Sequence, residues 1–272
     1  MCLILLGWHA HPAYPLVFAG NRDEAYNRPS TAADFWRDEP RLYGGRDLEK
    51  GGAWLGITIA GRIAAVTNYR DGHATKDAPR SRGELAADYL RGTDEPRPYL
   101  ERVMSSARSY AGFSLIAGDL GRLFFCSNRG AGIEEIPSGV HGLSNHLLNT
   151  PWPKVRRGKE KLTGLRGADK SGLVRELFDI LGDRTVAPDA ELPDTGIGLQ
   201  RERELSPAFV AGDGYGTRAS TVLLVDCGGE VTFIERAFGE HGEPLGTTAR
   251  RFMLAPRAET RDAPHPSWSR RA

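Results

Sequence analysis

The chain has 272 residues, with 36 lysines and arginines against 35 aspartates and glutamates, so its formal net charge is +1. This balance argues against an electrostatic nucleic-acid binder, which normally carries a clear basic excess. Hydrophobic residues make up 40% and charged residues 26%, the composition of a folded globular protein. The length allows one large core.

The sequence carries no pattern typical of export or membrane insertion. No apolar run approaches the roughly 20 residues that span a bilayer. The apolar start, residues 1–6, lacks a basic flank and stops at Gly7. The three cysteines, Cys2, Cys126 and Cys227, lie far apart, which fits a reducing compartment and excludes a disulfide framework. We therefore expect a cytoplasmic protein without a transmembrane segment.

Four strand–turn–strand patterns predict antiparallel hairpins. They pair residues 3–6 with 16–19, 54–59 with 62–68, 113–117 with 122–127, and 221–226 with 230–235. Apolar residues at helical spacing predict helices between these hairpins, the first after Ser81 as N-cap, over residues 82–91, 98–108, 154–165 and 171–181. Hairpins grouped with helix pairs indicate an α+β fold in which helices cover antiparallel sheets.

The remaining segments predict the domain limits. Residues 183–216 are rich in proline, glycine and charge and predict a long loop. Residues 255–272 hold three prolines and many charges, which predicts a disordered tail. We therefore expect one domain over residues 1–254.

Cys2 is the first candidate for chemistry. Removal of Met1 would leave Cys2 with a free α-amino group, whose pKa of about 7.7–8.0 suits a general base for its own thiol. The alternative is a cysteine with no special role. Cys126 and Cys227 lie in or beside predicted strands, so we expect them to be small buried side chains.

A polar block, residues 20–24, ends the second predicted strand. Antiparallel pairing of the first two strands brings this block next to Cys2. Arg22 can lower the pKa of a nearby thiol, and Asp23 can accept a hydrogen bond from a protonated amine. The alternative is a solvated turn with a weak surface ion pair.

Three more polar side chains lie in polar segments at strand ends. Asn68 and Asn145 have the uncharged N–H donors that an oxyanion hole needs, and Arg218 could neutralise an acidic substrate. For each asparagine the alternative is an ordinary turn residue. The histidines lack metal-ligand spacing, so we expect no metal site.

These residues together resemble the NRDE family, the family of transport and Golgi organisation protein 2. The resemblance covers residues 2 to about 238 and rests on Cys2 and on the segments 20–24, 51–56, 67–70, 142–145, 150–154, 192–196, 206–207 and 215–218. The family is similar to N-terminal-nucleophile hydrolases, which implies a four-layer αββα sandwich of two antiparallel sheets between helix layers.

The resemblance extends to the bile-salt hydrolase and penicillin V acylase group, in which an N-terminal cysteine attacks an amide carbonyl. It implies Cys2 as nucleophile, Arg22 and Asp23 as its supporting pair, and Asn68, Asn145 and Arg218 as the rest of the site. Those hydrolases have an Arg-Asn-x-Asp order where this chain has Asn21-Arg22-Asp23-Glu24. Asn21 or Glu24 could therefore take one of these roles.

Two functions follow as hypotheses. The first is an amide or thioester hydrolase that uses Cys2 and requires no cofactor. The second, also implied by the resemblance, is a non-catalytic carrier of haem or of lipid or acyl-CoA ligands. Haem could bind through its propionates to Arg22 and Arg218, or through an axial ligand from Cys2, His9, His11, His141 or His146. In either case the expected partner is a small-molecule or lipid-like ligand.

Overall fold

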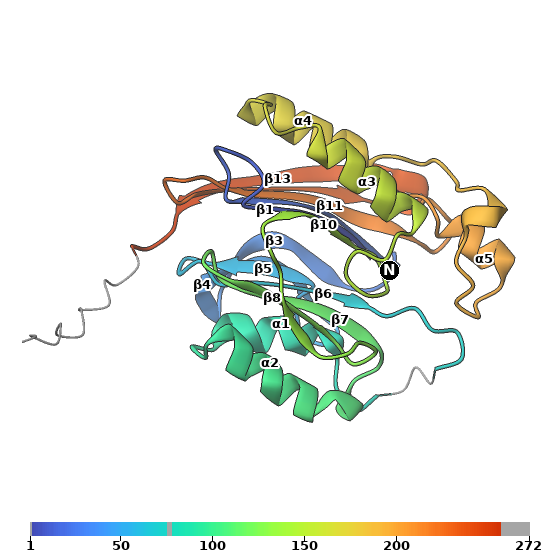
Figure 1. Cartoon of the computed structure of the whole chain (residues 1–272), viewed down its shortest axis with the longest axis horizontal. Helices are drawn as coiled ribbons and strands as arrows, with labels where there is room; N and C mark the ends of the chain where they lie inside the picture. Colours follow the sequence, from blue (N-terminus) through green and yellow to red (C-terminus); the bar gives the residue numbers. More distant parts are fainter. Residues whose placement is uncertain (1, 75–77, 257–272) are drawn as a thin grey trace, which may run out of the picture.

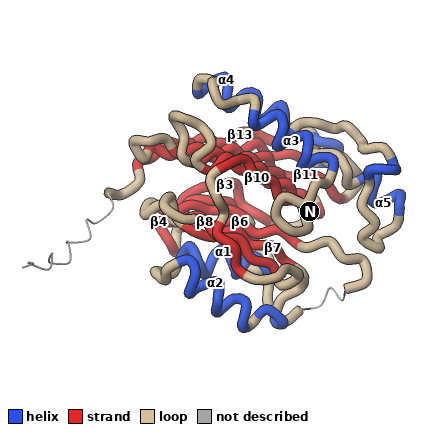
Figure 2. Tube along the Cα trace, viewed as in Figure 1, coloured by secondary structure: helices blue, strands red, loops and turns tan. Residues whose placement is uncertain are grey.

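The protein is a sandwich of two antiparallel β-sheets between two layers of helices, seen here in a computed structural model that describes residues 2–74 and 78–256 (Figure 1). The strands form the two central layers and the longer helices lie outside them (Figure 2). This arrangement confirms the predicted α+β class and the four-layer αββα order.

The six-stranded sheet carries the N-terminal end of the described chain in its interior. Its strand order is β10-β1-β2-β11-β12-β13, with neighbours antiparallel. In chain order these strands are β1 (Cys2–Trp8), β2 (Leu16–Ala25), β10 (Gly139–Leu143), β11 (Tyr215–Val225), β12 (Glu230–Phe238) and β13 (Pro244–Met253). Because β1 lies between β10 and β2, Cys2 begins a strand that is paired on both sides.

The seven-stranded sheet follows chain order from β3 to β9. Its strands are β3 (Ser30–Trp36), β4 (Glu39–Asp47), β5 (Leu55–Thr58), β6 (Ile63–Asn68), β7 (Phe113–Gly118), β8 (Leu123–Ser127) and β9 (Ile133–Glu135). Its outer face is covered by α1 (Arg82–Arg91) and α2 (Pro96–Ser105), while α3 (Pro153–Thr163) and α4 (Lys170–Leu181) cover the six-stranded sheet (Figure 1).

Strand β1 shows how side-chain alternation separates the core into layers. Ile4 and Leu6 belong to the apolar cluster between the two sheets, whereas Leu3 and Leu5 belong to the cluster under α3 and α4. Successive side chains of a strand point to opposite faces, so both faces of β1 are buried. The same alternation directs Cys2 toward the space between the sheets.

The four predicted hairpins and four predicted helices are confirmed, with shifts of up to three residues at most ends and extensions of six residues at the end of β2 and at the start of β11. Helix α1 has its predicted bounds and begins with a capping box. Ser81 accepts a hydrogen bond from Gly83 N–H, and the Glu84 side chain accepts one from the backbone N–H of Ser81. This box fixes the first turn of α1.

Other elements were not predicted. They are β3, β4, β9, β10 and β13, together with the short helix α5 (Leu199–Glu204). The prediction of one long loop over residues 183–216 is wrong in part, because α5 and the start of β11 lie within it. Strand β13 is exposed along most of its length, so its sequence shows little alternation.

The predicted tail lies mostly outside the described residues, which end at 256. Ala255, its first residue, donates a backbone hydrogen bond to the carbonyl oxygen of Ile59 at 2.7 Å. None of the described helices is long and apolar enough to cross a membrane.

Candidate functional site

A cavity of about 580 Å³ opens beside Cys2. Its lining comes from β1, β2, β3, β4, β6, β11, β12 and β13 and from the start of α1, so both sheets contribute. Five of the six predicted site residues line it, namely Cys2, Arg22, Asp23, Asn68 and Arg218. The sixth, Asn145, is hydrogen-bonded to Asn68.

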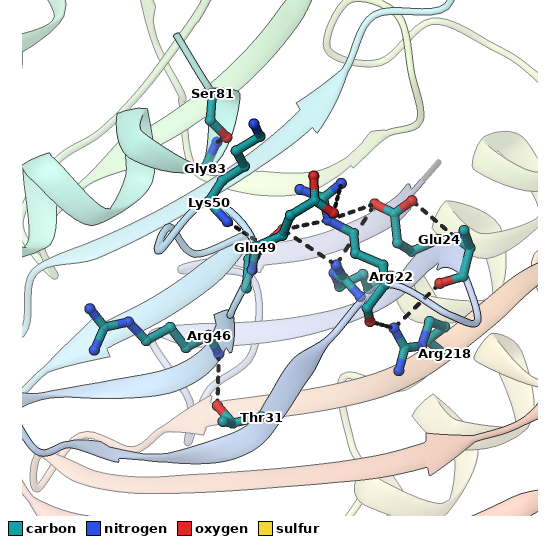
Figure 3. A network of polar contacts seen from close by, with 12 residues as sticks. Arg22, Glu24, Thr31, Arg46, Glu49, Lys50, Ser81, Gly83 and Arg218 are labelled. Atoms are coloured by element: carbon teal, nitrogen blue, oxygen red, sulfur yellow. Dashed lines mark hydrogen bonds and ion pairs between the residues drawn. The ribbon is translucent and has the colours of Figure 1, made fainter.

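Strand pairing explains why Arg22 lies beside Cys2. The two residues are directly opposite in the β1–β2 register, so their side chains share one face of the sheet. Arg22 is also within 3.7 Å of Glu24 and 3.9 Å of Asp47, close enough for loose ion pairs. The pair with Glu24 (Figure 3) holds the Arg22 guanidinium at the cavity wall, which Cys2 also lines.

The alternation of β2 divides the block 21–24 between two environments. Arg22 and Glu24 face the space between the sheets, whereas Asn21 and Asp23 face the helix layer, as their apolar neighbours do. Asn21 donates to the carbonyl oxygens of Leu181 at 2.9 Å and Ala208 at 2.8 Å. These bonds give Asn21 a role in attaching the loop before β11 to β2.

The environment of the Cys2 thiol contains opposing influences. Burial raises the pKa of Cys2 above its usual value, and the Asp23 carboxylate adds to this rise. A hydrogen bond from the Asp23 backbone and the charge of Arg22 lower the same pKa. The side chain is only 7% exposed, so the cavity is its route to reactants.

Asp23 is the most deeply buried acid of the site, at 2% exposure. Its Oδ1 accepts a hydrogen bond of 2.7 Å from the hydroxyl of Thr217. Burial raises the pKa of Asp23, and the nearby charge of Lys154 lowers it. Lys154 is itself buried, which lowers its pKa to about 8, and its Nζ donates to Leu205 O at 2.9 Å.

Asn145 positions Asn68. Its Nδ2 donates to the backbone oxygen of Asn68 at 3.1 Å and to the side-chain Oδ1 of Asn68 at 2.8 Å. With Oδ1 accepting, the Nδ2 group of Asn68 is the part of that amide left to face the cavity. Asn68 therefore lies at the cavity, and Asn145 reaches it only through its contact with Asn68.

A β-bulge brings Arg218 to the site. Thr217 pairs with Asp23 and Ala219 pairs with Arg22, so Arg218 is an extra residue in β11. Bulges of this kind redirect a side chain. The Arg218 guanidinium donates to the carbonyl oxygens of Ala25 and Arg28 and so supports the turn after β2 (Figure 3).

Arg82, which was not predicted as a site residue, lines the cavity from the first turn of α1. The signal was its position three and four residues before Leu85 and Ala86, on the apolar face of the helix. Gly52 and Gly83 hold this turn against the segment before β5. A Cβ on Gly52 would lie 2.4 Å from the backbone of Gly83.

The remaining cysteines and the histidines lie elsewhere. Cys126 is fully buried, as predicted, and burial raises its pKa to about 12. The prediction for Cys227 is wrong, since it is exposed in the turn between β11 and β12. Among the described residues that line the cavity there is no histidine.

The sequence profile described as Transport and Golgi organisation 2 matches residues 1–240. The chain is 38% identical to the transport and Golgi organization protein 2 homolog of Bos taurus, over 93% of this chain and 99% of that protein. The chain belongs to the Transport and Golgi organisation 2 family. It is also 30% identical to the family member of Drosophila melanogaster, over 89% of this chain and 95% of that protein.

Solved structures show weaker similarity. An N-acylethanolamine-hydrolyzing acid amidase ortholog of Caenorhabditis elegans aligns with a TM-score of 0.47 at 14% identity, over 82% of this chain and 92% of that chain. A mutant of the conjugated bile acid hydrolase of Clostridium perfringens aligns with a TM-score of 0.46 at 8% identity, over 93% and 92% of the two chains.

Several segments that carried the family resemblance meet around the buried ion pair of Arg70 and Glu202. Arg70 and Glu202 form an ion pair of 2.5 Å, although 202 lies outside those segments. Glu202 also accepts from the backbone and hydroxyl of Thr195, at 3.1 and 2.5 Å. The ring of Trp152 lies 4.7 Å from the Arg70 guanidinium. These contacts attach the loop before α5 to the end of β6.

Proposed function

We propose that the protein is an N-terminal-cysteine hydrolase that cleaves an amide or thioester, with Cys2 as nucleophile after removal of Met1. The observation that carries this proposal is the convergence on one cavity of a thiol, a guanidinium opposite it and an oriented amide donor: Cys2, Arg22 and Asn68. Strand pairing alone places Arg22 beside Cys2, but Asn68 comes from the other sheet, and no local pairing brings its amide to the same cavity.

The chemistry would proceed by addition and elimination. The freed α-amine of Cys2 takes the thiol proton, and the thiolate forms a C–S bond with the carbonyl carbon. Asn68 Nδ2 donates to the resulting oxyanion. The C–N or C–S bond to the leaving group then breaks as that group receives the proton from the α-ammonium. Water hydrolyses the acyl-cysteine and releases the acid and the free thiol.

Asp23 and Arg22 support different steps of this reaction. Asp23, which pairs with Thr217 near the end of β2, supplies the carboxylate that favours the ammonium form of the α-amine. Arg22 favours the thiolate form of Cys2. Asn145 keeps the amide of Asn68 in its donor orientation. The assignment therefore gives each of the predicted residues a distinct task, with Arg218 left to substrate binding.

Acyl-enzyme formation tests the proposal without knowledge of the natural substrate. Intact mass is measured first, and the mature chain is expected to lack Met1. The protein is then mixed with an acetyl thioester of N-acetylcysteamine, and acetylated peptides are quantified. We expect a transient acetyl group on Cys2 and turnover in wild type and in Cys227→Ala, but neither in Cys2→Ala.

Cys227→Ala is the matched control because Cys227 is exposed and remote from the cavity lining. Retention of Met1 in the active protein would overturn the mechanism. Unchanged thioester turnover in Cys2→Ala would exclude Cys2 as nucleophile.

A carrier of haem or of lipid or acyl-CoA ligands is the second candidate, favoured by the size of the cavity, about 580 Å³. Since the described cavity lining holds no histidine, the axial ligand to a haem in this cavity would be Cys2. Titration with haem, followed at the Soret band, tests this function. A spectral change that is lost in Cys2→Ala supports it, and no change at tens of micromolar protein removes haem as the cargo.

A further inference from the structure

Basic side chains outnumber acidic ones around the cavity. Seven basic residues line it, Arg22, Arg28, Arg46, Lys50, Arg80, Arg82 and Arg218. Five acidic residues do so, Asp23, Glu24, Asp47, Glu84 and Glu235. Among the lining residues, basic side chains therefore exceed acidic ones by two, and burial raises the pKa of Glu235, which weakens its charge. An anion is therefore the ligand that this lining favours.

Among the described residues, the ion pairs around the cavity do not include the guanidiniums of Arg82 and Arg218. Arg28 pairs with Asp47 at 2.6 Å, and Arg80 pairs with Glu84 at 2.8 Å. Arg22 lies near Glu24, at 3.7 Å. These contacts account for most of the acidic groups at the cavity wall.

In the described part of the chain, Arg82 and Arg218 donate hydrogen bonds to backbone oxygens only. Arg82 Nη1 donates to Gly112 O at 3.2 Å, and Arg218 Nη1 donates to the oxygens of Ala25 and Arg28. Each carbonyl is a weaker partner for a guanidinium than a carboxylate would be. Further N–H groups of both side chains remain for a ligand, since a guanidinium has five donors.

Charges of both signs act on the two residues. The charge of Arg28 acts against the guanidinium of Arg82 and the charge of Arg22 against that of Arg218, whereas the charge of Glu24 attracts both. The thiolate form of Cys2 is the strongest attractive charge acting on Arg82. A partly buried guanidinium whose charge is incompletely compensated costs stability, and a bound anion would remove this cost. Figure 3 shows Arg22 and Arg218 on one side of this region and the start of α1, at Ser81 and Gly83, on the other.

We propose that Arg82, together with Arg218, binds an anionic group of the substrate, a carboxylate or a phosphate, beside Cys2. This inference rests on the proposed function in calling the ligand a substrate, but the binding itself requires no catalysis. Arg82 comes from the helix layer under the seven-stranded sheet and Arg218 from the six-stranded sheet. A bound anion would therefore bridge the two halves of the sandwich and fix the acyl group over the thiol.

Alkylation of Cys2 by two reagents of similar size tests the proposal. Iodoacetate carries a carboxylate and iodoacetamide is neutral, and each loses iodide as the thiolate forms a C–S bond. Rates are measured on the full chain by peptide mass spectrometry, with exposed Cys227 as internal reference. The iodoacetate-to-iodoacetamide rate ratio is expected to be about tenfold higher at Cys2 than at Cys227, in line with one added charged hydrogen bond.

The ratio separates anion binding from tuning of the thiol, because a change in the thiolate fraction affects both reagents equally. In Arg82→Met the ratio at Cys2 should fall most of the way to that of Cys227, since only Arg218 remains to bind the anion, and in Arg82→Lys it should fall less. Arg122→Met is the control, since Arg122 is exposed and pairs with Glu135 away from the cavity. An unchanged ratio in folded Arg82→Met would overturn the proposal.

Competition in the wild-type protein provides a test that does not depend on the folding of a variant. Inorganic phosphate and acetate are each added during iodoacetate labelling, with sodium chloride at equal ionic strength as control. Slowing by phosphate alone assigns a phosphate group, and slowing by acetate alone or by both assigns a carboxylate site. No slowing beyond the chloride control would overturn the proposal. A retained Met1 or absent turnover would defeat the hydrolase mechanism and leave these binding results intact.

Discussion

Asn145 donates both hydrogens of its side-chain amide to Asn68, one to the backbone oxygen at 3.1 Å and one to Oδ1 at 2.8 Å. Asn145 is fully buried, and its backbone has a φ of 54°, a conformation that asparagine tolerates better than most residues. Its carbonyl oxygen also accepts from Arg70 N–H at 2.7 Å. One residue thus joins the end of β10 to the end of β6.

Asn145→Asp tests this junction. The substitution keeps the shape but replaces the donor with an oxygen that faces two oxygens of Asn68. We expect a loss of roughly 2 kcal/mol in the free energy of unfolding, the cost of buried polar groups that lose their partners. Urea denaturation measures this loss. Asn27→Asp is the control at an exposed asparagine, and equal stabilities of the two variants would contradict the assigned role.

Antiparallel pairing is the part of the site that could be predicted from the sequence. Apolar runs around short turns predicted the β1–β2 hairpin, and its register places Cys2 opposite Arg22. The contact between Asn145 and Asn68 could not be predicted, because it depends on how the turn after β10 folds against β6. Arg82 was not predicted as a site residue, because helical spacing places it on the apolar face of α1 but does not say which part of the protein that face contacts.

Strands at the sheet margins escaped prediction for a related reason. Strand β3 has three exposed positions and two buried ones, and the three buried positions of β4 are consecutive, so neither strand shows apolar alternation. They are held by cross-strand pairing and by buried anchors such as Tyr43 and Trp36. Buried Glu202 in α5 was hidden within a segment whose composition is typical of loops.

Lys154 is expected to make stability rise with pH above neutrality. Burial lowers its pKa from 10.5 to about 8, so between these values the unfolded chain binds more protons than the folded chain. Stability then increases with pH across this range, by roughly 1 kcal/mol per unit. Below about pH 8 the lysine is protonated in both states and contributes no slope.

The measurement compares urea denaturation of wild type and Lys154→Met from pH 7 to 9.5, below the range in which exposed tyrosines ionise. The variant loses hydrogen bonds to Leu205 O and Pro207 O and is expected to be less stable at every pH. The informative quantity is the slope, which should be smaller in the variant. Parallel curves would show that Lys154 has an ordinary pKa.

The buried ion pair between Arg70 and Glu202 is expected to stabilise the loop before α5. Glu202→Gln would leave the Arg70 charge poorly compensated at 5% exposure and weaken the bonds from Thr195. We expect a loss of about 3–5 kcal/mol. Limited proteolysis should also cut more readily near residues 192–198.

The control for this prediction is the exposed ion pair between Arg203 and Asp189, at 2.5 Å. Asp189→Asn should change the unfolding midpoint far less than Glu202→Gln, because solvent screens an exposed pair. If both variants shift the midpoint equally, burial does not set the strength of the Arg70–Glu202 pair.

Gly52 is expected to control the position of Arg82. A Cβ at residue 52 would lie 2.4 Å from the carbonyl carbon and 2.7 Å from the Cα of Gly83, and backbone atoms cannot move aside as a flexible side chain can. Gly52→Ala must therefore displace the first turn of α1, with a cost of roughly 1–3 kcal/mol. Gly167→Ala is the control, since a Cβ there meets nothing within 4 Å. In Gly52→Ala the iodoacetate preference of Cys2 should fall while Arg82 itself is intact. A variant that is destabilised but keeps the full preference would show that the close approach of Gly52 and Gly83 serves packing alone and does not place the guanidinium.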